Sequence, residues 1–198
     1  MTPPLILASG SKARAQMLQG AGLTFETIPA DIDEQTLLQQ MVRQKTAPET
    51  IAAQLARAKA QHVAQQNPDA YVIGGDQILW FEERLFSKAK DAAEARQNLR
   101  AFSGKTHTLI SAACVVQNDN ILWEGVAQAH MTMRRFDDAF LDGYMDMAGD
   151  ALLKTVGGYE LESAGKMLFE KVDGDYFTVL GLPLLPLQEF LKGAHNES

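Results

Sequence analysis

The stretch Tyr71-Val-Ile-Gly-Gly-Asp-Gln-Ile-Leu-Trp-Phe81 has the character of a core β-strand with a polar interruption. Both ends are apolar and rich in β-branched and aromatic residues, whereas the middle holds two glycines, Asp76 and Gln77. Buried strands rarely carry an aspartate without a reason, and glycines let a ligand approach the backbone closely. Asp76 is therefore either a metal ligand or general base for water, or an ordinary turn aspartate in a hairpin.

Helices and strands alternate on the N-terminal side of this stretch. Short apolar or alternating runs predict strands, and helix-forming runs that end at Gly or at Asn67-Pro68 predict helices. The expected elements are a strand at 5–8, a tight turn at 9–11, a helix at 13–18, a strand at 24–28, and helices at 35–44 and from 48 onward.

The C-terminal side mixes longer strands with capped helices. Asp91 and Asp137 are typical N-cap residues, and Asn118-Asp-Asn marks a turn between two long strand-like runs. The expected elements are a turn at 82–84, a helix from 91 to 102, strands at 106–116 and 121–136, a helix from 137 to 147, a loop at 157–158, a hairpin at 173–174, and a final helix after Pro183. With no linker or repeat, we expect one α/β domain over residues 1–198 with an antiparallel middle.

Composition limits the partners of the chain. It has 198 residues, 46% of them hydrophobic, and a net charge of −7. A protein that binds duplex DNA or RNA normally needs a basic face, so nucleic acid is not expected, but a small polyphosphate remains compatible with a few aimed donors and a divalent cation. No run approaches a membrane span, and Met1-Thr-Pro-Pro lacks the character of a signal peptide, so we expect a cytoplasmic protein.

Cysteine and histidine do not form metal-binding patterns. The single cysteine, Cys114, lies in an apolar run and is expected in the core, without a disulfide. The histidines, His62, His107, His130 and His195, have no ligand-type spacing.

A phosphate site is one interpretation of the N-terminal turn. Backbone N–H groups at a helix start point at an anion, and Ser9, Ser11 and Arg14 can add donors. The alternative is that a serine only caps the helix and that Arg14 lies on the surface. Acids near Pro29, Asp33 or Glu34, could complete a metal site with Asp76, or be solvated loop residues.

Five segments together resemble the Maf family, in the family's order and over most of the chain. One such segment would be weak evidence, but five in order leave little room for chance. The segments are Leu5-Ile-Leu-Ala-Ser-Gly-Ser11 followed by Arg14, Leu55-Ala-Arg-Ala-Lys59-Ala, Val72-Ile-Gly-Gly-Asp76, Leu99-Arg-Ala-Phe-Ser-Gly104, and Gly174-Asp-Tyr-Phe-Thr-Val-Leu-Gly-Leu-Pro183.

This resemblance implies a fold and a reaction. The fold is an elongated mixed sheet similar to that of the inosine triphosphate pyrophosphatases, with two lobes flanking a central cleft. The reaction is hydrolysis of a nucleoside triphosphate to the monophosphate and pyrophosphate with Mg²⁺ or Mn²⁺. The expected partners are that nucleotide and, as an open alternative, a second copy of the chain in a homodimer.

Roles follow residue by residue from the resemblance. Asp76 matches the catalytic acid, and Lys59 and Lys88 match two lysines that contact phosphates. Glu34 matches an acid near the metal, and Asp76 is expected to bind the same metal. Ser9, Ser11 and Arg14 match the phosphate loop. Taken alone, each lysine would be expected to be an exposed surface residue.

Three family positions sort substrates, and here they are Ala13, Gln77 and Glu162. Members selective for thymidine and uridine triphosphates carry Arg, Thr and Gln, and members that resemble 7-methylguanosine triphosphate enzymes carry Trp, Gln and Glu. Gln77 and Glu162 match the second group. Ala13 matches neither, since it lacks the indole that could stack on a cationic base.

Departures from the family pattern concern specificity more than catalysis. Lys12-Ala13 replaces Pro-Arg, Ala89 replaces a proline, and Ser163 stands where the family has glycine. Two rival functions use the same residues without fast turnover: a non-enzymatic regulator of septum formation and a nucleotide sensor. Retention of Asp76 and the two lysines favours an enzyme, because binding alone needs no acid that activates water.

Overall fold

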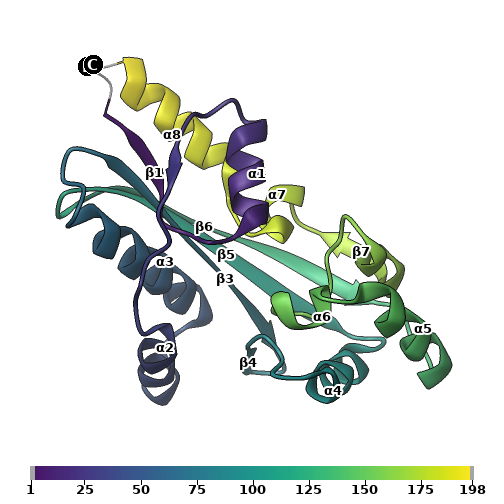
Figure 1. Ribbon diagram of the computed structural model, residues 1–198. Coiled ribbons are helices and arrows are strands. Elements are labelled where there is room, and N and C mark those ends of the chain that lie inside the picture. Colours follow the sequence, from purple (N-terminus) through teal and green to yellow (C-terminus); the bar gives the residue numbers. More distant parts are fainter. Residues whose placement is uncertain (1–2, 197–198) are drawn as a thin grey trace. The chain divides into compact units, whose positions relative to one another are not determined.

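The computed structural model describes the backbone of residues 3–196 and the side chains up to residue 194, and it consists of a mixed sheet with helices packed on it (Figure 1). The α/β fold class is confirmed. The strands are β1 (Leu5–Leu7), β2 (Glu26–Thr27), β3 (Tyr71–Phe81), β4 (Arg84–Phe86), β5 (Thr106–Gln117), β6 (Asn120–Met133) and β7 (Phe169–Asp173). The helices are α1 (Lys12–Gly20), α2 (Glu34–Arg43), α3 (Pro48–Ala64), α4 (Ala92–Phe102), α5 (Asp138–Ala148), α6 (Ala151–Lys154), α7 (Tyr176–Leu180) and α8 (Leu184–Asn196), with a 3₁₀ helix η1 (Ala164–Leu168).

The sheet is mixed, with parallel pairing at one edge. Its order is β2-β1-β3-β5-β6-β7, and β4 pairs with β3 off this path. β1 pairs parallel with both β2 and β3, whereas β3 with β4 and β6 with β7 are antiparallel. β5 and β6 are neighbours joined by a two-residue turn, which only antiparallel strands allow. The antiparallel middle of the chain is therefore confirmed.

The described residues divide into two compact units. The first contains residues 3–77, 110–127 and 176–196, and the second contains residues 78–109 and 128–175. β3, β5 and β6 each contribute residues to both units. The single-domain organisation, the elongated outline and the cleft between lobes stay predictions.

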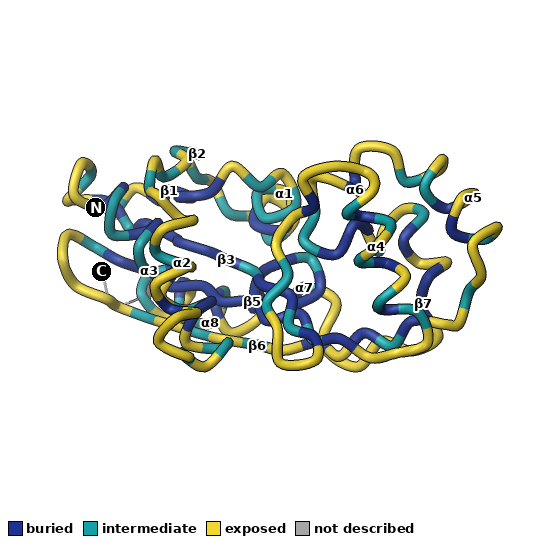
Figure 2. Tube along the Cα trace, turned by 90° about the horizontal axis from the view of Figure 1, so that it is seen from below, coloured by how far each residue is buried: buried dark blue, intermediate teal, exposed yellow. Residues whose placement is uncertain are grey.

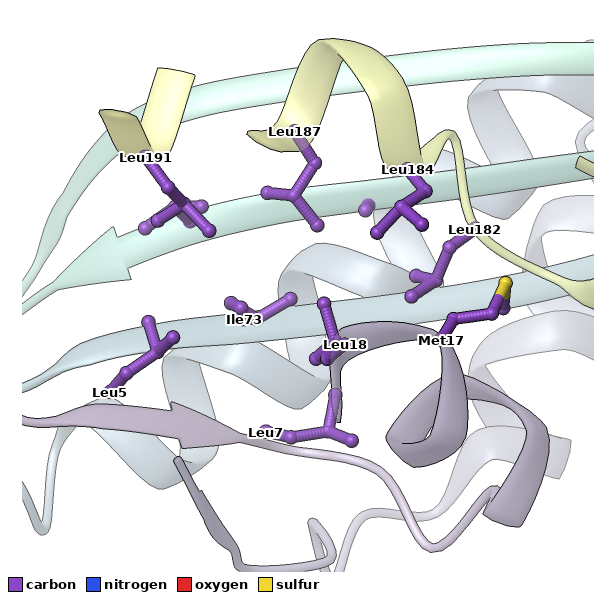
Figure 3. Packing of buried hydrophobic residues seen from close by; sticks show 11 residues of the cluster. Leu5, Leu7, Met17, Leu18, Ile73, Leu182, Leu184, Leu187 and Leu191 are labelled. Carbon is purple, nitrogen blue, oxygen red and sulfur yellow. The ribbon is translucent and has the colours of Figure 1, made fainter. Parts of the chain in front are cut away.

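The core of the first unit lies between the sheet and a pair of helices. In Figure 3, Leu18 of α1, Leu187 of α8 and Ile73 of β3 point toward one another. All three side chains are almost fully buried. On the opposite face, α3 buries Ile51, among other apolar residues, and Figure 2 shows that β3 and β5 are buried along most of their length. Sandwiching between helices explains why the runs in β3 and β5 are almost continuously apolar.

Aromatic rings dominate the core of the second unit. His107 of β5 lies among these rings, with its centroid 4.9 Å from that of Phe102 and 5.7 Å from that of Tyr159. The neighbouring rings in edge contact are Phe81, Phe86, Phe102, Tyr159 and Phe169. His107 Nε2 and the Tyr159 hydroxyl are 2.6 Å apart, and burial lowers the pKa of His107 to about 3. The histidine is therefore a neutral core residue.

Most predicted elements are present, and one turn is wrong. Asp91 and Asp137 cap α4 and α5 through hydrogen bonds to the backbone N–H three residues on. The hairpin predicted at 173–174 does not form, because the chain continues from β7 into α7. Gly174 makes this exit at φ 146°, and a Cβ there would lie 2.7 Å from Ala129 of β6. The glycine marks close packing against β6 rather than a strand reversal.

No helix within residues 3–196 combines the length and the apolar character that crossing a bilayer requires.

Candidate functional site

The middle of β3 presents alternate residues to its two faces. A Cβ at Gly74 would lie 2.0 Å from the Ala56 carbonyl oxygen of α3, whereas a Cβ at Gly75 would lie 2.9 Å from the side chain of Leu182 and 3.2 Å from that of Arg14. Because side chains alternate along a strand, Asp76 shares the face of Gly74 and Gln77 shares the face of Gly75. Gly74 thus allows α3 to approach one face of β3 closely. Gly75 allows Leu182 and Arg14 to approach the other face.

Asp76 forms a buried ion pair on the α3 face. Lys59 Nζ lies 2.5 Å from Asp76 Oδ1 and 2.7 Å from Glu34 Oε2. Lys59 is only 8% exposed and Asp76 only 7% exposed, while the Glu34 side chain is about half exposed. The interpretations of Lys59 as a surface lysine and of Asp76 as a turn aspartate are wrong, because both side chains are buried and Asp76 lies inside a continuous strand. Three residues that the sequence marked for catalysis or metal binding therefore meet.

Asp33 has a different role from its neighbour Glu34. Its carboxylate accepts a hydrogen bond from the Thr36 backbone N–H at 3.0 Å and so caps α2. A hydrogen bond from the Thr36 side chain, and then this capping hydrogen bond, lower the pKa of Asp33. Of the two acids considered for the metal site, Glu34 is the one that reaches Lys59.

The charges of this region influence one another. Burial raises the pKa of Asp76, and the positive charges of Lys59 and Arg14 act in the opposite direction. Burial lowers the pKa of Arg14, and the negative charges of Asp76 and Glu34 oppose that change. Arg14 therefore belongs to the same electrostatic environment as the buried ion pair.

The turn before α1 holds Arg14 in place. Its Nη1 donates to Ser9 Oγ and its Nε to the Gly181 carbonyl oxygen, each at 3.0 Å. Ser11 is the N-cap of α1, with its Oγ 3.4 Å from the Arg14 backbone nitrogen. The interpretation of Ser11 as an N-cap is confirmed, whereas that of Arg14 as a surface residue is wrong, since its guanidinium bridges two segments. Phosphate binding by Ser9, Ser11 and Arg14 stays a prediction.

Gln77 and Ser111 form a second polar group on the other face of β3. Gln77 Nε2 lies 3.0 Å from Ser111 Oγ and from the carbonyl oxygens of Thr178 and Val179. Ser111 Oγ donates to the Thr178 carbonyl at 2.7 Å. Sequence reasoning missed Ser111, although it is a lone hydroxyl in the apolar run 109–116, which is an unusual place for one.

The other predicted residues are not part of this arrangement. Ala13 lies half-buried in the first turn of α1. Lys88 is exposed in the segment between β4 and α4, and Glu162 is exposed in the turn before η1. Both of these belong to the second unit, whereas Asp76 belongs to the first. The roles predicted for Ala13, Lys88 and Glu162 stay predictions.

The two carboxylates at Lys59 are the candidate metal ligands. Within the part of the chain that the structure describes, no group of three or more His, Cys, Asp or Glu side chains is arranged to hold a metal ion. Asp76 and Glu34 nevertheless offer oxygen donors at one place, and Mg²⁺ is commonly held by one or two carboxylates together with substrate phosphates and water. The donor set fits a hard divalent cation that arrives with a polyphosphate.

Cysteine and histidine lie apart from this group. Cys114 is buried and free, and burial raises the pKa of its thiol to about 12. His107 lies in the core of the second unit, and His130 Nδ1 lies 3.1 Å from Thr108 Oγ1. The side chain of His195 is outside the described residues.

Comparisons with known proteins place the chain in a family. The family described as Maf-like protein matches residues 4–194. A protein of Rhizobium etli named 7-methyl-GTP pyrophosphatase is 46% identical over 94% of this chain and 94% of its own. A protein of Bradyrhizobium diazoefficiens named nucleoside triphosphate pyrophosphatase is 48% identical over 96% of this chain and 93% of its own. The structure of a HAM1 protein from Coxiella burnetii aligns with 96% of this chain and 99% of that chain, at a TM-score of 0.49 and 14% identity. The family match and the two sequence relatives extend over nearly the whole chain, and the chain belongs to the Maf family.

Proposed function

We propose that the protein is a nucleoside triphosphate pyrophosphatase that hydrolyses its substrate to the nucleoside monophosphate and pyrophosphate. The observation that carries the proposal is the buried pair of Asp76 and Lys59, 2.5 Å apart, with Glu34 on the same lysine. Burying a carboxylate and an ammonium costs free energy, and buried ionisable groups of this kind are concentrated at functional sites. The names of the two relatives support this reaction class.

Asp76 is proposed as the general base. Its burial raises its pKa, which makes the carboxylate a stronger base, while Lys59 and Arg14 favour its ionised form. In the proposed step, the oxygen of a water attacks the α-phosphorus, and Asp76 takes the proton. The bond between the α-phosphorus and the bridging oxygen breaks, and pyrophosphate leaves with the electron pair.

Positive charge and backbone dipoles are proposed to stabilise the leaving group. Arg14 and the N-terminus of α1, with Ser9 and Ser11, supply donors for phosphate oxygens. Lys59 is also positively charged, and it lies beside the proposed base, Asp76. Lys88 is proposed as a further phosphate contact on the strength of its position in the sequence.

A divalent cation is proposed as the cofactor, with Asp76 and Glu34 as its protein ligands. When bound, Mg²⁺ or Mn²⁺ would neutralise charge on the phosphate oxygens. Lys59 occupies both carboxylates in this structure. Lys59 contacts only one oxygen of each, Asp76 Oδ1 and Glu34 Oε2, so the second oxygen of each carboxylate is the proposed donor to the cation.

A 7-methylguanosine triphosphate is the proposed substrate. Glu162 can accept hydrogen bonds from the guanine N1 and N2 donors, and the Rhizobium etli relative carries that substrate in its name. Ala13 provides no ring for stacking. We therefore expect recognition to depend on hydrogen bonds more than on cation–π contact.

The test is a panel of uridine, thymidine, guanosine and 7-methylguanosine triphosphates with Mg²⁺ or Mn²⁺, scored by pyrophosphate release. We expect release that depends on the metal, with the highest kcat/KM for the methylated guanine nucleotide. Glu162→Gln should lower its preference over uridine triphosphate about tenfold, since a guanine donor would then face an amide donor, a mismatch that costs roughly 1–3 kcal/mol where the bound nucleotide excludes water. Glu170→Gln, which changes an exposed acid of β7, is the matched control. Equal effects of Glu162→Gln on both nucleotides would remove the base assignment, and absence of release from all of them would remove the function.

A further inference from the structure

We infer that Ser111 is a positioning residue, which acts through α7 and Gly181 to hold the guanidinium of Arg14 in place. The inference rests on the proposed function only in giving Arg14 a phosphate to bind. Ser111 belongs to none of the five segments on which the family resemblance rests, and its hydroxyl does not contact Arg14 itself.

The donors and acceptors around Gln77 fix the direction of each hydrogen bond. Two partners of its amide are carbonyl oxygens, of Thr178 and Val179, which can only accept, so the amide nitrogen must face them. The Ser111 hydroxyl gives its single proton to the Thr178 carbonyl and accepts from Gln77 Nε2. The Gln77 amide nitrogen therefore donates to the backbone of α7. Gln77 is expected to affect activity by holding α7 in place.

The Thr178 carbonyl links this group to Arg14. It accepts hydrogen bonds from Ser111 Oγ at 2.7 Å, from Gln77 Nε2 at 3.0 Å and from the Gly181 backbone N–H at 3.2 Å. Gly181 in turn accepts from Arg14 Nε through its own carbonyl at 3.0 Å. A continuous series of hydrogen bonds therefore runs from the Ser111 hydroxyl to the guanidinium.

The turn that carries Gly181 is held by these bonds together with its own backbone bonds, since the N–H groups of Gly181 and Leu182 also donate to the Phe177 carbonyl. α7 has only five residues, and Gly181 has a φ of 111°, a conformation that favours glycine. A Cβ on Gly181 would lie 3.5 Å from Arg14 Nε and Nη2. Ser111 and Thr178 are completely buried, so bulk solvent does not reach the Ser111 hydroxyl. Loss of this hydroxyl is expected to let the end of α7 shift, and Arg14 with it.

Kinetics give the first test. Ser111→Ala should lower kcat/KM about tenfold, mainly by raising KM, because small displacements of a positioned group have effects of this order. Thr108→Ala is the matched control, since it removes a hydroxyl of the same strand that contacts His130 instead. The control should stay within about twofold of the unmodified protein. In an Arg14→Lys background, Ser111→Ala should have almost no further effect, because residues that act through one another are not additive.

A spectroscopic readout separates this inference from the proposed function. The NMR signal of the Arg14 Nε–H group, identified by its loss in Arg14→Lys, should shift in Ser111→Ala and in Gln77→Met but not in Thr108→Ala. An unchanged signal in Ser111→Ala, or additive kinetic effects of the Ser111 and Arg14 changes, would overturn the inference. If the unmodified protein releases no pyrophosphate, the proposed function fails, and the NMR signal still decides whether Ser111 positions Arg14.

Discussion

At the scale of single residues, Asp76 carries the proposed chemistry. Asp76→Asn should lower kcat/KM by at least about a hundredfold, the scale expected for loss of a general base. The fold should persist, because the amide is nearly isosteric and the position is held by β3. Circular dichroism and thermal unfolding check the fold, and Asp119→Asn in the exposed turn before β6 serves as the control. Near-normal turnover in a folded Asp76→Asn protein would exclude Asp76 as the base.

His107 predicts how stability depends on pH. Its pKa is about 3 in the folded protein and about 6.5 in the unfolded chain. Because the pKa of His107 is lower in the folded protein, its contribution to the free energy of unfolding is complete above pH 6.5. This contribution is lost as pH falls toward 3, by up to about 1.4 kcal/mol per pH unit.

Denaturant unfolding between pH 7 and pH 4 measures this effect. His107→Gln should make the loss of stability clearly less steep over that interval, whereas His130→Gln, which changes an exposed histidine, should leave it as it is. Parallel profiles of stability against pH for the unmodified protein and for His107→Gln would show that His107 is protonated in the folded protein. That result would contradict its assignment as a neutral core residue.

At the scale of elements, Gly74 sets how closely α3 approaches β3. A Cβ at this position would lie 2.0 Å from the Ala56 carbonyl oxygen and 2.8 Å from Ala60 Cβ, so α3 would have to move. Gly74→Ala should therefore cost about 1–3 kcal/mol of stability, the range of overpacked cores, and should separate Lys59 from Asp76 enough to lower activity.

A second glycine provides the control for that experiment. Gly143 lies in α5 with no atom within 4 Å of a built Cβ. Gly143→Ala should stabilise the protein by about 0.5–1 kcal/mol, because alanine is the better helix former. If both alanines changed stability equally, as measured by urea unfolding, close packing of α3 on β3 would not be the reason for Gly74.

Local patterns predicted the regular elements well. Apolar periodicity and the caps Asp91 and Asp137 gave the helices and strands, because these signals are contained in a few neighbouring residues. The hairpin predicted at Gly174 was wrong. A glycine that is needed for close packing against Ala129 cannot be distinguished in sequence from a glycine that reverses a strand. α6 and η1 are short and have no strong periodic signal.

At the scale of the whole molecule, the sequence predicted which residues lie together better than how they contact one another. Asp76, Lys59 and Glu34 were all identified, but the Lys59 ammonium that joins both carboxylates follows from the packing of α3 on β3. Ser111 was missed because its partners are the Thr178 backbone carbonyl, 67 residues away, and the Gln77 side-chain amide, 34 residues away, and no local pattern marks such distant partners.

The central claim is cleavage at the α-phosphorus, and hydrolysis in ¹⁸O-labelled water tests it most directly. With 7-methylguanosine triphosphate and Mg²⁺ or Mn²⁺, mass spectrometry of the products should find the label in the nucleoside monophosphate and unlabelled oxygen in the pyrophosphate. Label in pyrophosphate would show attack at the β-phosphorus, and nucleoside diphosphate as the main product would show attack at the γ-phosphorus. Either result would contradict the reaction proposed for Asp76.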